Sequence, residues 1–101
     1  MPRRRLSAEE AARYVEFRRL LAEERERAGL SQGELGAKLN PPRPQSYVAK
    51  IELGLRRLDP LEYWDIGRAV GFDPCRLLRR VDEITRKNSG KRSAKGKRSM
   101  R

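Results

Sequence analysis

Two short stretches of sequence decide the fold, GLSQGELGAKL at residues 29–39 and PQSYVAKIELG at residues 44–54. In the first stretch, Ser31 is followed three residues later by Glu34, which forms a capping box, the signal that begins a helix. The leucines that follow recur at a four-residue step, so they lie on one face of that helix. The first stretch therefore predicts a short helix that ends at about Leu39.

The second stretch predicts a helix over about residues 45–53. Pro44 suits its first turn, where a missing N–H costs no hydrogen bond, and Gly54 suits its end. Between the two helices lies the sequence NPPR at residues 40–43, and its prolines cannot continue a helix. The two predicted helices are therefore joined by a stiff, extended connection.

Three further helices complete an all-α prediction of five helices. The first spans about residues 8–28, because another capping box begins at Ser7 and Gly29 suits a helix end. Two later starts pair an aspartate with a proline at the first helical position, which predicts helices over 59–70 and 74–87. The apolar residues predicted on the inward faces of these last two helices are Leu61, Trp64, Val70, Leu77, Leu78, Val81 and Ile84.

The positive charge of the chain is concentrated at its C-terminal end. The 101 residues carry 25 Lys and Arg against 14 Asp and Glu, and eight of these basic residues lie in 86–101, which contains no acid. Residues 88–101 also have almost no apolar surface to bury, so we expect a disordered basic tail there. The predicted organisation is therefore a flexible segment over 1–7, a single domain over 8–87 and this tail. The tail suits a DNA-tracking arm, a nucleoid-retention tag or a solubilising extension.

The residue types present exclude several classes of function. The chain has no His and one Cys, which excludes an intrachain disulfide, a Cys/His zinc site and a His-dependent catalytic triad. The carboxylates form no cluster with catalytic spacing, so we expect neither an enzyme nor a cofactor. No apolar run approaches the roughly 20 residues of a membrane span, and no apolar region follows the N-terminal arginines. A cytoplasmic protein without a membrane partner is predicted.

The two central stretches resemble the Cro/C1-type (XRE) helix-turn-helix family over about residues 17–81. The matching residues are Gly29-Leu30-Ser31-Gln32, Glu34-Leu35, Leu39 and Val48-x-x-Ile51-Glu52-x-Gly54. The resemblance implies a lambda-repressor-like fold that binds double-stranded DNA, with the helix over about 45–53 as the recognition helix in the major groove. The connection at 40–43 is longer than family members usually have.

The resemblance also implies which side chains meet the DNA. Gln32 matches a position that anchors a phosphate, and Gln45 and Ser46 match the first exposed positions of the recognition helix. A glutamine can pair with an adenine through two hydrogen bonds. The other implied contacts are Lys50 to a guanine or phosphate, Arg43, Arg56 and Arg57 to phosphates, and Tyr47, expected to be exposed, to a thymine methyl or the backbone. The competing interpretation is that these side chains form only a solvated polar face and make no contact with DNA.

Other side chains are expected to hold the scaffold. By the same resemblance, Glu52 follows the core residue Ile51 and makes a structural hydrogen bond or ion pair with Arg25. Trp64 is expected in the core and not as a base-stacking platform, and Tyr63 either in the core or at a dimer surface. Cys75 follows a proline at a helix start, which invites a redox interpretation, but a packed or incidental thiol is the expectation.

The leading hypothesis is a sequence-specific transcriptional regulator, a repressor, that acts as a homodimer. Because one recognition helix reads only a few base pairs, two copies on a palindromic operator are expected. The alternative is an antitoxin that binds a toxin partner through its last helix or tail and also represses its own operon. A third hypothesis is a basic RNA-binding module, which the small number of aromatic residues disfavours.

Overall fold

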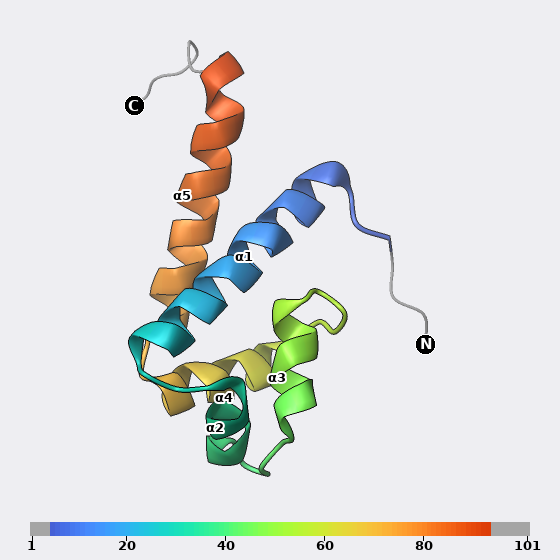
Figure 1. The fold of residues 1–101 in the computed structure, drawn as a ribbon. Coiled ribbons are helices and arrows are strands. Elements are labelled where there is room, and N and C mark those ends of the chain that lie inside the picture. Colours follow the sequence, from blue (N-terminus) through green and yellow to red (C-terminus); the bar gives the residue numbers. More distant parts are fainter. Residues whose placement is uncertain (1–4, 94–101) are drawn as a thin grey trace.

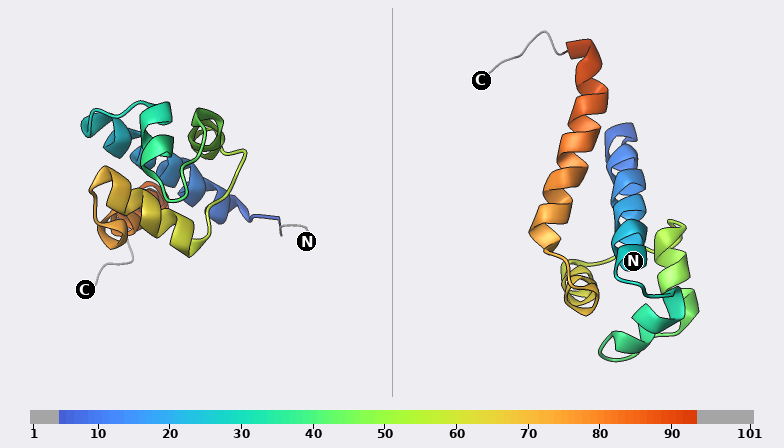
Figure 2. Two further views of the ribbon diagram at one scale, coloured as in Figure 1. Left: turned by 90° about the horizontal axis from the view of Figure 1, so that it is seen from below. Right: turned by 60° about the vertical axis from the view of Figure 1, so that its left-hand side comes forward.

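The computed structural model describes residues 5–93, with side chains to residue 88, and this part of the chain folds into five helices and no strand (Figure 1). In chain order they are α1 (Ala8–Arg27), α2 (Gln32–Lys38), α3 (Gln45–Glu52), α4 (Pro60–Val70) and α5 (Pro74–Ser93). The long helices α1 and α5 lie side by side, and α1 separates α5 from α3 (Figure 2). The predicted all-α fold of five helices is confirmed.

Hydrogen bonds at the helix starts explain where α1, α2 and α4 begin. The side chains of Ser7, Ser31 and Asp59 accept a bond from the backbone N–H three residues on, at 3.1, 3.0 and 2.8 Å. The glutamate at that position accepts a bond back from the capping residue's own N–H. In α2 this bond from the Ser31 backbone holds the pKa of the Glu34 carboxyl below its ordinary value. Each cap stabilises its helix by about 1 kcal/mol.

Apolar side chains from all five helices form one core. Leu20 of α1 is fully buried, and Val48 and Ile51 of α3 are 2% and 3% exposed. Burying a side chain of this size stabilises the fold by about 1.5–3 kcal/mol. The buried members of the core are Leu20, Leu21, Leu35, Leu39, Tyr47, Val48, Ile51, Tyr63, Ile66, Leu77 and Val81.

The inward faces predicted for α4 and α5 are partly wrong. On α4, Leu61 is 75% exposed and Trp64 is 49% exposed, whereas Tyr63 and Ile66 are buried. On α5, Leu78 is also 49% exposed, although its neighbours in the prediction lie in the core or pack against it. The core alternative for Tyr63 is thereby confirmed.

The turn between α4 and α5 explains which face of α4 is buried. A Cβ at Gly67 would lie 2.7 Å from the ring of Pro74, so the missing side chain lets α4 come close to the start of α5. The hydroxyl of Tyr63 then donates to the backbone oxygen of Pro74 at 2.6 Å, and its ring packs edge-on against Phe17 of α1 at 5.1 Å. These contacts point the opposite face of α4, with Trp64, towards the surface.

The last helix is longer than the sequence predicts. α5 continues to Ser93, whereas the prediction ended it at about Lys87. An ion pair between Arg86 and Asp82, at a spacing of four residues, supports this part of the helix. The rest of the predicted tail, residues 94–101, and residues 1–4 of the predicted N-terminal segment lie outside the described residues.

Candidate nucleic-acid interface

The long connection between α2 and α3 packs tightly against α2. The backbone N–H of Arg43 donates to the oxygen of Gly36 at 2.8 Å. A Cβ at Gly36 would lie only 2.3 Å from the oxygen of Arg43, so any larger residue would push the connection away. The prolines of the connection therefore lead the chain back onto α2, and α3 begins from a fixed point.

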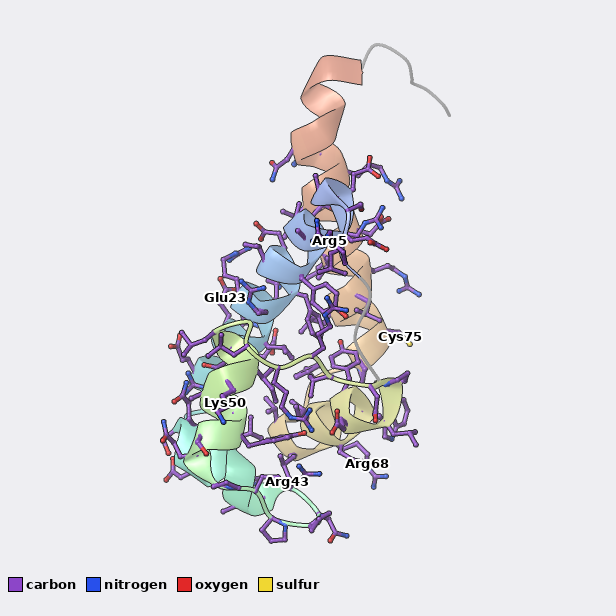
Figure 3. All side chains as sticks on the ribbon, turned by 90° about the vertical axis from the view of Figure 1, so that its right-hand side faces the viewer. Arg5, Glu23, Arg43, Lys50, Arg68 and Cys75 are labelled. Atoms are coloured by element: carbon purple, nitrogen blue, oxygen red, sulfur yellow. The ribbon has the colours of Figure 1, made fainter. Side chains whose placement is uncertain are left out.

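The outward face of α3 carries the polar side chains that the resemblance assigned to base contacts. Gln45, Ser46 and Lys50 are all exposed, while Val48 and Ile51 on the opposite face are buried. Lys50 forms no ion pair within residues 5–88. Figure 3 places Lys50 on α3 above Arg43, which precedes the helix, with Cys75 on the other side of the view. The geometric requirement for reading a groove with α3 is met.

A chain of hydrogen bonds runs from α1 to the first turn of α3. Arg25 of α1 forms an ion pair with Glu52, with its Nε 2.7 Å from Oε2, and the two side chains are only 11% and 12% exposed. The Gln32 side chain donates to Oε1 of Glu52 at 2.9 Å, and that of Gln45 donates to Oε1 of Gln32 at 2.7 Å. The expected pairing of Arg25 with Glu52 is confirmed. The side-chain bond to Glu52 raises the pKa of Arg25.

This chain of bonds leaves the amide of Gln45 able to read a base. Its Nε2 carries two hydrogens, of which one goes to Gln32, and its Oε1 accepts no hydrogen bond from the described side chains or backbone of residues 5–88. The free hydrogen and Oε1 match N7 and the N6 amino group of adenine. Gln32 is bonded within the protein at both ends of its amide, and one hydrogen of its Nε2 remains for the phosphate contact that the resemblance implies.

The expectation that Tyr47 is exposed is wrong. Tyr47 is 8% exposed because positions 47, 48 and 51 share the inward side of α3. Its ring stacks with two guanidinium groups, that of Arg43 at 4.5 Å and that of Arg56 at 4.8 Å. Burial raises the pKa of the Tyr47 hydroxyl. The ring therefore offers little surface to a thymine methyl, and the guanidinium groups of the two arginines already stack on it.

The two arginines that follow α3 are held by contacts inside the protein. Arg56 forms an ion pair with Glu62 at 2.6 Å, and Glu62 at the same time caps the start of α4. Arg57 lies over the ring of Tyr14, with its guanidinium carbon 5.8 Å from the ring centre. Both arginines are half-buried. They lie next to α3 as expected, but with less freedom than solvated side chains have.

The comparisons with known proteins match a segment that contains α2 and α3. The sequence model of a family described as "Helix-turn-helix domain" matches residues 16–79. A solved structure, an XRE-family like protein from Pseudomonas syringae pv. tomato str. DC3000, is 45% identical and superimposes with a TM-score of 0.68. The match covers 74% of this chain and 89% of that one. The chain belongs to the XRE-type helix-turn-helix family. No curated protein matches the sequence.

As an XRE-type helix-turn-helix protein, the chain is a DNA-binding regulator of transcription in the general sense. Within residues 5–93 no helix combines the length and apolar character that a membrane crossing needs. The same residues contain no group of acidic and sulfur ligands that could hold a metal ion.

Sequence reasoning missed two features of this XRE-type site. The first is the stack of Arg43 and Arg56 on Tyr47; only the four-residue step from 43 to 47 could have indicated part of it. The second is the bond between Gln45 and Gln32, which joins residues 13 positions apart. No local pattern predicts either contact in full, because both depend on how α3 packs against α2 and on the path of the loop that follows α3.

Proposed function

We propose that this protein is a repressor that binds a palindromic operator as a homodimer and reads the major groove with the outward face of α3. The observation that carries the proposal is the exposure of Gln45, Ser46 and Lys50 on a helix whose opposite face is core. A duplex can therefore approach α3 without any rearrangement of the domain.

Base reading is assigned to the start of α3. Gln45 is held in place by Gln32 before the DNA arrives, so less side-chain entropy is lost on binding. Its remaining donor and acceptor suit an adenine, a pairing worth about 1–3 kcal/mol against a wrong base. Ser46 lies beside it, and Lys50 reaches a guanine or a phosphate one turn further along α3.

Phosphate contacts are assigned to the arginines beside α3. Arg43 stacks on Tyr47 at the start of the helix, which presents its guanidinium in a fixed orientation. Arg56 and Arg57 follow the helix, and Gln32 retains one amide hydrogen. Such contacts fix the position of the protein on the duplex and make binding sensitive to salt.

Two copies are needed because a single α3 reads too few base pairs to find one site in a genome. A two-fold symmetric pair predicts half-sites about one turn of DNA apart. Occupation of such a site over a promoter would block transcription, and it would place the protein at the nucleoid.

Selection of bound duplexes from a random DNA library tests the proposal. We expect enrichment of one sequence with two-fold symmetry. On that duplex, Lys50→Ala should weaken binding and lower the slope of log affinity against log salt by about 1 if Lys50 meets a phosphate, or alter the preference for one base pair if it meets a guanine. Lys87→Ala removes an exposed cation from α5 and serves as the matched control. A library that shows no enrichment at moderate salt rules the proposal out.

A further inference from the structure

An open groove of about 650 Å³ lies between α1, α4 and α5. Its lining is largely aromatic and aliphatic, and it includes Tyr14, Phe17, Tyr63, Trp64, Leu78 and Val81. Tyr63 and Val81 are buried, whereas Trp64 and Leu78 are each 49% exposed. The groove is thus open to solvent along Trp64 and Leu78, which suits a macromolecular surface better than an enclosed small ligand.

The outer face of α4 continues this apolar surface. Leu61 and Trp64 are three residues apart and lie on one face of the helix, with 75% and 49% of their surface exposed. A surface helix of a monomer normally carries polar residues on its outer face. Tryptophan is among the residues most enriched in the centres of protein interfaces. The face therefore lacks a partner in the isolated chain.

Charged side chains of both signs line the same groove. Arg13 of α1 is exposed and forms no ion pair within residues 5–88, while Asp82 of α5 and Asp59 before α4 supply carboxylates. Asp59 is engaged in capping α4, and the exposed pair of Asp82 with Arg86 on its own helix is worth little. In a two-fold symmetric pair each surface meets its own copy, so a cation and a carboxylate on the same groove can pair across the axis. The groove therefore carries both members of the charge pair that a second copy of this chain would need.

We propose that this groove is the homodimer interface, with Trp64 of each copy inserted between α1, α4 and α5 of the other. The inference rests on the proposed function in one respect, the need for two copies on a palindrome. Figure 2 shows α1 between α5 and α3, and no residue of α3 lines the groove. Dimerisation through the groove therefore leaves the outward face of α3 uncovered.

Sedimentation equilibrium of the full chain without DNA tests the interface. We expect a dimer for the wild type, and a dissociation constant at least about tenfold higher for Trp64→Glu and Leu78→Glu. Val15→Glu is the matched control, because Val15 is also 49% exposed but lies outside the groove. Far-UV circular dichroism checks that each variant is folded. A monomeric wild type at about 100 µM, or equal dimerisation of all four proteins, overturns the inference.

Charge reversal gives a second test that leaves the apolar residues intact. Arg13→Asp should weaken the dimer roughly tenfold, and addition of Asp82→Arg should restore it, because the pair is rebuilt across the interface. Failure of the double variant to recover affinity contradicts the arrangement. Cys75, the single cysteine of the chain, lines the groove and is exposed. Its alkylation with a bulky maleimide should therefore also give monomers.

The two proposals fail separately. If the library selection shows no sequence preference but Leu78→Glu still dissociates the dimer, the proposed interface stands and the proposed operator binding is contradicted. Conversely, if the groove variants leave dimerisation unchanged, the proposed interface is contradicted, and the assignment of α3 as the recognition helix still stands. If both hold, Leu78→Glu should bind a single half-site as the wild type does and lose its advantage on the full palindrome.

Discussion

Replacement of Glu52 by glutamine tests the link between the scaffold and the reading helix. The carboxylate accepts two bonds from Arg25, at 2.7 and 3.1 Å, and one from Gln32 at 2.9 Å. Glutamine has nearly the same shape, but it removes the charge and turns N–H groups towards the donors of Arg25. The Arg25 side chain, which is 11% exposed, then keeps only the more distant carboxylate of Glu26, at 3.7 Å, as an ionic partner.

The expected loss of stability is large for a domain of this size. Removal of one partner from a fully buried ion pair costs about 3–5 kcal/mol. Arg25 and Glu52 are only part-buried and the glutamine keeps one amide oxygen, so we expect at most about 3 kcal/mol for Glu52→Gln. Small domains have about 5–15 kcal/mol in total. The upper value of about 3 kcal/mol corresponds to a fall in Tm of roughly 12–24 °C. Affinity for the operator should fall about two- to tenfold further, because Gln32 no longer fixes Gln45.

Glu26→Gln is the matched control for this variant. Glu26 also lies near Arg25, at 3.7 Å, but its side chain is 69% exposed. The same substitution there should change the free energy of unfolding by less than about 0.5 kcal/mol. Urea unfolding followed by circular dichroism measures both variants. Equal midpoints for Glu52→Gln, Glu26→Gln and the wild type would refute the stabilising role of the Arg25–Glu52 pair.

Three further predictions concern the neighbourhood of α3. Tyr47→Phe should retain operator affinity, because its ring still supports two guanidiniums, whereas Tyr47→Leu should lose about 1–2 kcal/mol of binding; equal affinities in fluorescence anisotropy would contradict the stacking role. Gly36→Ala should destabilise the domain by at least about 1–3 kcal/mol in urea unfolding, since its Cβ would lie 2.3 Å from the oxygen of Arg43, and a neutral result would show that the connection yields freely. The pKa of Glu34 is lowered in the folded chain, so its stabilising contribution is complete above about pH 4.3 and is lost as the pH falls through the folded pKa. Glu34→Gln should therefore reduce the stability that is lost on acidification. An unchanged dependence of stability on pH in the acid range would contradict the role of Glu34 in the cap.

Local signals predicted most of the fold. Capping residues, glycines and prolines act on the backbone within a few positions, so they indicated where the helices begin and end. Ser31 and Asp59 begin helices for this reason. The length of α5 was underestimated, because polar residues that cannot fill a core still sustain a helix. The polar face of α3 was also predictable, since Val48 and Ile51 define its inward side.

The details of the site depend on tertiary packing and were not predictable from sequence. Trp64 is surface-exposed because Gly67 brings the opposite face of α4 against the next turn, a contact with no local signature. Tyr47 combines an apolar ring with a polar hydroxyl, and its neighbours on α4 and in the turn decide whether the side chain is buried or exposed. The bond from Gln45 to Gln32 requires both helices in place. Such contacts decide what each side chain can offer to DNA.

The base preference of Gln45→Ala tests the reading of DNA by α3 most directly. Binding of this variant and of the wild type is measured on every single-base variant of the selected operator. We predict that the wild type loses about 1–3 kcal/mol when one base pair per half-site is changed, and that Gln45→Ala loses this discrimination at that pair alone. An unchanged preference at every position of the operator would contradict the assignment of base reading to the start of α3.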